Sequence, residues 1–179
     1  MKIVYLVGSL SSQSINRGLS KVLVDVAPEG TEMVEFPIGK LPLYNRDYDA
    51  DYPQIARDFK AELESADGVL LITPEHNRMY SAAMANAIEW SSRPWGHWSL
   101  GGKPVAAIGA SPSGIGTASA QQHLRSTLLF FGSKVMGQPE GYIDATKAGL
   151  TPEGAISDSS KEFLTGWMQA FVKFVEDNK

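Results

Sequence analysis

Four serines stand close together in one turn near the start of the chain (GSLSSQS, residues 8–14): Ser9, Ser11, Ser12 and Ser14. Each hydroxyl can donate a hydrogen, and the helical pattern that follows begins with backbone N–H groups that have no partner inside a helix. The positive end of such a helix also favours an anion. The turn therefore predicts an anion site. Serine is equally the ordinary residue for capping a helix, and Ser14 is the candidate cap.

The residues that this turn lacks limit the size of the anion. A nucleoside triphosphate loop has the pattern G-x-x-x-x-G-K-[ST], and a pyrophosphate loop has G-x-G-x-x-G. Here Gly8 is the only glycine of the turn, and no lysine is present. We therefore expect the turn to bind a single terminal phosphate.

Two further turns follow apolar segments, at residues 74–81 (PEHNRMYS) and 110–116 (ASPSGIG). Pro74 stiffens the first, and Asn77 offers both donor and acceptor groups, which suits a flat heteroaromatic ring with polar edges. An ordinary surface connection would have a similar composition. In the second, Gly114 and Gly116 would let a ring come close, and Ser111 could reach its edge. No G-x-S-x-G motif occurs, which argues against a serine hydrolase.

Strand-like and helix-like segments alternate along the chain. Apolar runs predict strands at residues 2–7, 31–36, 68–73 and 103–110, and a weaker one at 134–136. Helical spacing predicts helices over residues 15–26, 55–63, 81–90 and 120–128, and a last helix whose inner face includes Phe163, Trp167 and Phe171. The aromatic residues Trp90, Trp95 and Trp98 suit packing more often than the wall of a pocket or a subunit contact.

This alternation predicts a single α/β domain over residues 1–179. We expect a flavodoxin-like doubly wound fold, with a five-stranded parallel sheet in the order 2-1-3-4-5 and helices on both faces. In such sheets ligands bind beyond the carboxyl ends of the strands, where the strand order reverses. The three turns should therefore meet at one edge.

Composition excludes several classes of function. The net charge is −4 with both signs interspersed, so no basic stripe is available for nucleic acid. The chain has no cysteine, and its three histidines lack ligand spacing, so we expect no disulfide and no metal site. No apolar run is long enough for a membrane span or a signal peptide. We expect a cytoplasmic protein.

Four segments together resemble the NADPH-dependent FMN reductase family, the flavodoxin-like group of soluble quinone, chromate and azo-dye reductases. GSLSSQSIN resembles that family's phosphate loop, G-S-x-R-x-x-S-x-N, and LPLYNRD resembles its loop after the second strand. PEHNRMYSAAMANAIEW resembles P-E-Y-N-x-S-x-P-G-x-x-K-N-A-x-D-W, and GKPVAAIGASPSGIGTASAQQHLR resembles the fourth-strand segment. The match extends to about Arg125 and continues more loosely beyond it.

The resemblance implies FMN as the cofactor and NADPH or NADH as the co-substrate. Around the phosphate and ribityl end it places Ser9, Ser11, Ser14, Ile15 and Asn16, and around the isoalloxazine ring Pro74, Glu75, His76, Asn77, Arg78, Ser111 and Gly114. The chain departs from the family pattern in three places: Ser11 replaces arginine, His76 replaces tyrosine, and residues 79–82 replace S-x-P-G. Arg17 is the cation that could take over the lost phosphate contact.

We therefore expect an FMN-dependent NAD(P)H oxidoreductase that passes two electrons, as hydride through FMN, to a quinone, free flavin or similar small acceptor. No side chain in the three turns is an obvious obligatory acid or base, so no catalytic residue is predicted. Relatives in the family suggest a homodimer or homotetramer. The alternatives are a flavodoxin-type single-electron carrier, for which a charge of −4 is modest, and an FMN-binding sensor module.

Overall fold

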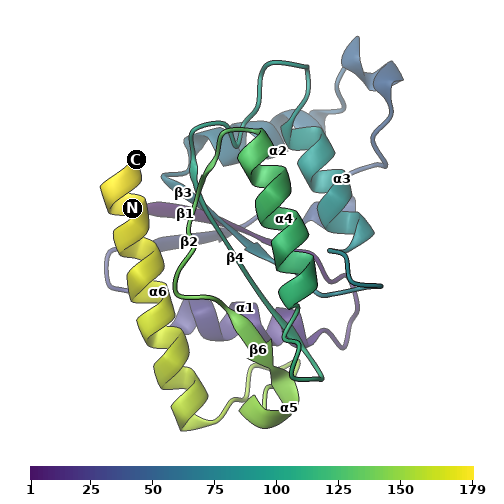
Figure 1. Ribbon diagram of the computed structural model, residues 1–179. Coiled ribbons are helices and arrows are strands. Elements are labelled where there is room, and N and C mark those ends of the chain that lie inside the picture. Colours follow the sequence, from purple (N-terminus) through teal and green to yellow (C-terminus); the bar gives the residue numbers. More distant parts are fainter.

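The strands of the structure are built from short apolar segments that helices cover on both sides. The computed structural model describes all 179 residues (Figure 1). The strands β3 (Gly68–Ile72) and β4 (Pro104–Ser111) are buried at every position. With β1 (Lys2–Val7), β2 (Glu32–Glu35) and β5 (Lys134–Val135), they form a parallel sheet in the order β2-β1-β3-β4-β5. The predicted flavodoxin-like strand order is confirmed.

The two faces of this sheet pack into separate apolar cores. Successive side chains of a strand point to opposite faces, so Ile3 and Val7 of β1 enter one core, and Val4 and Leu6 enter the other. Two helices cover the first face, and three cover the second (Figure 1). The first pair is α1 (Ile15–Asp25) and α6 (Asp158–Asn178), and the other three are α2 (Gln54–Ser65), α3 (Ala82–Ser91) and α4 (Ala118–Phe130).

A sixth strand, which the sequence pattern did not predict, extends the sheet beside the carboxyl end of β4. This strand, β6 (Tyr142–Asp144), runs parallel to β4 beyond the short β5, and a four-residue helix, α5 (Ala145–Ala148), follows it. Three residues are too few to show a periodicity, so sequence alone gave no sign of this strand. It places Asp144 opposite Ser111, at the edge where the third turn begins.

The last helix packs through a slightly different face from the predicted one. Trp167 and Phe171 are buried as expected, but Phe163 is 45% exposed, and Leu164 takes the core position. At about 100° per residue, Leu164 lies roughly 20° from Phe171 around the helix axis, whereas Phe163 lies roughly 80° away. Phe163 therefore stands at the margin of the apolar stripe.

The long connection between β2 and α2 contains two short 3₁₀ helices, η1 (Ile38–Lys40) and η2 (Arg46–Asp49), and packs on α3. The carbonyl oxygen of Pro42 accepts hydrogen bonds from Asn86 Nδ2 at 3.0 Å and from Trp90 Nε1 at 2.8 Å. The rings of Tyr44 and Tyr52 lie 5.2 and 5.5 Å from the Trp90 ring. Trp90 is therefore a packing residue, and it anchors this connection.

None of the helices combines the length and the apolar character that crossing a bilayer would require.

Two glycines inside helices give a matched test of the packing. A Cβ atom at Gly18 of α1 would lie 1.8 Å from the carbonyl oxygen of Thr151, whereas a Cβ atom at Gly166 of α6 would meet nothing within 4 Å. Gly18→Ala should lower the free energy of unfolding by about 2–3 kcal/mol, because backbone must move to admit the methyl group. Gly166→Ala should raise it by about 0.5–1 kcal/mol through helix propensity. Urea unfolding measures both, and equal effects would contradict the described contact between α1 and residue 151.

Candidate functional site

The three turns singled out in the sequence meet at one edge of the sheet. Ile72 of β3 pairs with Val7 of β1 on one side and with Ile108 of β4 on the other, so the carboxyl ends of these strands lie side by side. The turn after β1 and the turn after β3 are joined directly, because Ser81 Oγ donates a hydrogen bond of 2.6 Å to the carbonyl oxygen of Gly8. The edge between the turns is the candidate site.

Ser14 caps α1, as the sequence predicted. Its buried Oγ accepts a hydrogen bond of 3.0 Å from the backbone N–H of Arg17, and α1 begins at the next residue, Ile15. As an acceptor in this bond, the hydroxyl keeps its own hydrogen available for donation. Capping a helix and contributing to an anion site are therefore compatible roles for this residue.

The turn after β1 presents a row of unpaired donors. The backbone N–H groups of residues 9–12 and 14 have no hydrogen-bond partner in the chain. The hydroxyls of Ser9 and Ser12 also make no bond, and Ser11 Oγ only accepts one, at 3.1 Å from the N–H of Gln13. The N–H groups of Ile15 and Asn16, at the start of α1, also have no partner, whereas that of Arg17 is bound to Ser14. Unpaired donors at the start of a helix are the groups that an anion would require.

The side chain of Asn16 has a different place from the one predicted. It is buried, its Nδ2 donates to the carbonyl oxygen of Ala110 at 2.9 Å, and its Oδ1 accepts from the N–H of Ala110 at 2.9 Å. Ala110 lies two positions beyond Ile108, the last β4 residue that pairs with β3. The amide of Asn16 therefore acts as a neighbouring strand would, and it positions the turn against β4 instead of extending toward a ribityl chain.

Arg17 does not replace the arginine that Ser11 displaces. Its guanidinium forms an ion pair with Glu35 at the end of β2. Tyr5 donates to the same carboxylate at 3.4 Å, and burial together with the Glu35 charge raises the pKa of Tyr5. The unpaired donors of the turn after β1 are therefore uncharged backbone and hydroxyl groups.

The turn after β3 is a tight two-residue turn that stands out from the sheet. His76 and Met79 exchange two backbone hydrogen bonds of 2.9 Å each. The two residues between them, Asn77 and Arg78, have left-handed φ angles of 52° and 67°. Asparagine adopts this conformation readily, whereas for arginine it costs roughly 1–2 kcal/mol. All four residues are exposed, so their backbone groups are accessible to a ligand.

The side chain of Glu75, in contrast, is buried and bound to other residues of the protein. Its side chain is 5% exposed, and its carboxylate accepts from the N–H of Ala120 at 3.1 Å and from the Arg78 guanidinium at 2.7 Å. Burial by itself raises the pKa of Glu75, but the Ala120 hydrogen bond and the Arg78 charge outweigh it and hold the pKa below its usual range. Its backbone, next to the buried Pro74, is the part left for contact with a ligand.

The two glycines of the third turn differ in their surroundings. Gly114 is exposed, and the nearest atom to a Cβ placed there would be Asp144 Oδ2 at 3.7 Å, so a ring could approach it. Gly116 is buried, and a Cβ there would lie 2.5 Å from the backbone of Tyr142. The expectation that Gly116 admits a ring is therefore corrected: its missing side chain makes room for β6. Ser111 Oγ donates to the carbonyl oxygen of Ser113 at 2.9 Å.

Sequence reasoning missed the roles of Ser81 and Asp144. Ser81 caps α3 by accepting from the N–H of Met84 at 3.2 Å, in addition to its bond to Gly8. A serine immediately before the helical segment AAMANAIEW was the available signal. Asp144 reaches the site edge through β6, and the sequence carried no signal for that strand.

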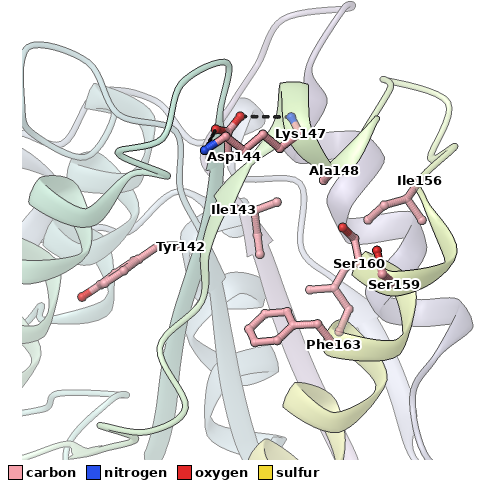
Figure 2. Close-up of a pocket in the computed structure, with 10 residues that line it drawn as sticks. Tyr142, Ile143, Asp144, Lys147, Ala148, Ile156, Ser159, Ser160 and Phe163 are labelled. Carbon is pink, nitrogen blue, oxygen red and sulfur yellow. Dashed lines mark hydrogen bonds and ion pairs between the residues drawn. The ribbon is translucent and has the colours of Figure 1, made fainter.

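A separate cavity lies among β6, α5 and α6 (Figure 2). Its volume is about 330 Å³, and apolar side chains including Ile143 and Phe163 line it. None of its lining residues belongs to the three turns, and none has a buried polar side-chain atom without a partner. The carboxyl ends of β1, β3 and β4 meet at the three turns, and a row of unpaired donors lies in the first of them, so the candidate site is placed there.

Comparison with known proteins identifies the family of the chain. The profile of a family described as NADPH-dependent FMN reductase matches residues 1–148. A 2-hydroxy-1,4-benzoquinone reductase from a Burkholderia species is 41% identical over 180 residues, which is 100% of this chain and 98% of the relative. A quinone reductase from Pseudomonas putida is 35% identical and covers 99% of this chain and 96% of its own.

Solved structures extend the comparison to the fold. The flavoenzyme FerB, an NAD(P)H:(acceptor) oxidoreductase from Paracoccus denitrificans, superposes with a TM-score of 0.92 at 41% identity, over 99% of this chain and 98% of FerB. A flavodoxin from Pseudomonas aeruginosa superposes with a TM-score of 0.63 at 15% identity, over 98% of this chain and 99% of its own, and shares the fold.

The two hydrogen bonds between the Asn16 side chain and the Ala110 backbone predict that replacing Asn16 destabilises the protein. Asn16→Ala should lower the free energy of unfolding of the ligand-free protein by about 2–4 kcal/mol, because it leaves a buried N–H and a buried C=O of Ala110 unpaired. Ser12→Ala is the control, because it removes only an exposed, unpaired hydroxyl two positions before the cap. It should change the free energy of unfolding by less than about 0.5 kcal/mol. Denaturant unfolding measures both variants. Equal stability for the two would contradict the strand-like role of Asn16.

Proposed function

The chain belongs to the NADPH-dependent FMN reductase family, and from this premise we propose how its three turns serve the reaction. The protein is an FMN-dependent NAD(P)H oxidoreductase. We propose that FMN binds at the junction of the three turns, and that a quinone or a similar small molecule receives the electrons there. The observation that carries this placement is the row of unpaired donors at residues 9–12 and 14.

The donor row fits one phosphate group. The N–H groups of residues 9–12 and 14, with the hydroxyls of Ser9 and Ser12, would surround the terminal phosphate of FMN. Ser14 would add its hydroxyl hydrogen while it keeps its cap. Since the turn itself has no lysine or arginine and Arg17 is paired with Glu35, neutral dipoles and the start of α1 would hold the phosphate charge.

The second and third turns fit the two edges of a flat ring. The backbone of residues 75–78 would meet the polar edge of the isoalloxazine ring, with the side chains of His76 and Asn77 beside it. Gly114 and Ser111 would approach from the opposite turn. Exposed apolar side chains on the first two turns, Leu10 and Met79, would contact a bound aromatic group and keep water from it.

Bound FMN supplies the chemistry that these residues lack, since it accepts a hydride from NAD(P)H and passes two electrons on to an acceptor. The protein binds and orients the reactants, and we assign no side chain as an obligatory acid or base. Glu75, the one acidic residue of the three turns, is already held as a carboxylate by Ala120 and Arg78. The named relatives are reductases, which favours an enzyme over a single-electron carrier.

Association of the chain into a homodimer or homotetramer is part of the same proposal. The exposed aromatic side chains of Trp95 and Phe130, whose ring centroids lie 6.3 Å apart, support it, because exposed apolar patches often mark contacts between proteins. We also propose a cytoplasmic location, where reduced nicotinamide nucleotides are available.

The phosphate cradle predicts a preference between flavins. FMN should bind at about one per chain, and FAD should bind far more weakly, because the turn lacks the glycines that admit a pyrophosphate. Ser9→Ala and Ser14→Ala should each weaken FMN binding by about 1–2 kcal/mol, the scale of a lost hydrogen bond to a charged group. Ser160→Ala, on α6, is the control and should bind as the parent does. Fluorescence titration measures these affinities. Equal affinity for FMN and FAD would contradict the single-phosphate cradle.

The enzyme assignment predicts turnover in both halves of the reaction. NADH or NADPH should bleach the visible absorbance of the bound flavin in one phase, and added quinone should restore it over many cycles. Stopped-flow absorbance measures both steps. Absent reduction by both nicotinamides, with normal FMN binding, would instead support the carrier alternative.

A further inference from the structure

The carboxylate of Glu75 joins two elements that the sheet does not connect. One oxygen, Oε2, accepts from the backbone N–H of Ala120 in the first turn of α4, at 3.1 Å. The other, Oε1, accepts from the guanidinium of Arg78 in the tight turn after β3, at 2.7 Å. The side chain of Glu75 is 5% exposed, so its carboxylate is largely shielded from water.

The start of α4 depends on this contact because it has no local cap. The N-cap residue, Thr117, is in the left-handed conformation with φ of 66°, and its side chain makes no cap hydrogen bond. Its hydroxyl instead accepts from Gln121 Nε2 at 2.9 Å. Glu75 therefore supplies, from another turn, the acceptor that a helix N-terminus needs. Its negative charge also suits the positive end of the helix dipole.

The tight turn after β3 depends on the other contact of the Glu75 carboxylate, the ion pair with Arg78. Arg78 holds a left-handed φ of 67°, which a residue with a side chain disfavours, and the turn is closed by only two backbone bonds between His76 and Met79. The side chain of Arg78 is 67% exposed, and its ion pair with Glu75 is the side-chain interaction that holds this turn to the protein. The carboxylate thus opposes the tendency of this turn to relax.

We propose that Glu75 is a positioning residue that fastens the tight turn at residues 76–79 to the first turn of α4. By doing so it sets where the backbone of this turn meets the edge of the FMN ring. The second part rests on the proposed function, whereas the fastening is a property of the protein alone. The lowered pKa agrees with it, since Glu75 is charged at neutral pH and can serve both donors.

Glu75→Gln tests the fastening with little change of shape. A glutamine has one acceptor oxygen, so its NH₂ group must face either the N–H of Ala120 or the guanidinium of Arg78, and both are donors. The matched control is Glu62→Gln, which removes a carboxylate paired with Lys2 at 2.7 Å near the opposite end of the sheet. Hydrogen–deuterium exchange of the full chain, with and without FMN, reads out residues 73–81 and 117–122.

In Glu75→Gln one of the two hydrogen bonds that the carboxylate accepts within the protein is lost, so we expect both segments to exchange about tenfold faster than in the parent. Because the turn is then less well positioned, FMN should bind about tenfold more weakly. The visible absorption bands of the bound FMN should shift as well, which a loss of stability alone would not produce. Glu62→Gln should leave exchange of these segments and FMN affinity within about twofold of the parent.

A second variant, Arg78→Ala, removes the contact of Glu75 with Arg78 and keeps its contact with Ala120. It also tests the proposal if Glu75→Gln does not fold. Arg78→Ala should speed exchange at residues 73–81 and leave residues 117–122 protected, because the bond from Glu75 to Ala120 remains. Parent-like exchange in both segments of Glu75→Gln, or equal changes in Glu75→Gln and Glu62→Gln, would overturn the proposal. If the parent itself fails to bind FMN, the proposed function fails, and the exchange measurement still decides the role of Glu75.

Discussion

The candidate site depends on how β4 ends. The strand continues past its last pair with β3, so the N–H and C=O of Ala110 would face that side without a partner. Buried backbone groups are seldom left unpaired, because each costs about 1–3 kcal/mol. The amide of Asn16 has the same donor and acceptor as a peptide group, and it fills the place of the missing strand. This pair of bonds holds the start of α1, and the donor-rich turn before it, at a set position on the sheet.

The same principle explains the rest of the edge. Strand ends and helix starts leave many backbone groups unpaired, and polar side chains from neighbouring turns bind several of them. Ser81 donates to the carbonyl oxygen of Gly8, and Glu75 accepts from the N–H of Ala120. The N–H groups of residues 9–12 and 14 are left without partners. The candidate site is therefore the part of this edge where a row of consecutive backbone donors remains free.

This arrangement suits a protein whose cofactor performs the chemistry. The family relation makes the chain a flavin-dependent oxidoreductase, and the polar side chains near the turns mainly support the backbone. A buried acid such as Glu75 could suggest a proton donor, but two donors already hold it as a carboxylate. In such a protein the polypeptide binds and orients the cofactor, and the cofactor carries the electrons.

The sequence by itself determined the order of the five main strands, the parallel sheet and the convergence of the three turns, because strand and helix periods and strand topology are local or generic properties. It also identified Ser14 as a cap, since capping depends on the next three residues. Only the tertiary structure showed that Asn16 serves β4, that Arg17 is taken by Glu35, that Gly116 makes room for β6 and that Glu75 caps α4. Each of these roles joins residues that are distant in sequence. A residue type states which bonds a side chain can make, and only the packing of the chain decides which partner is within reach.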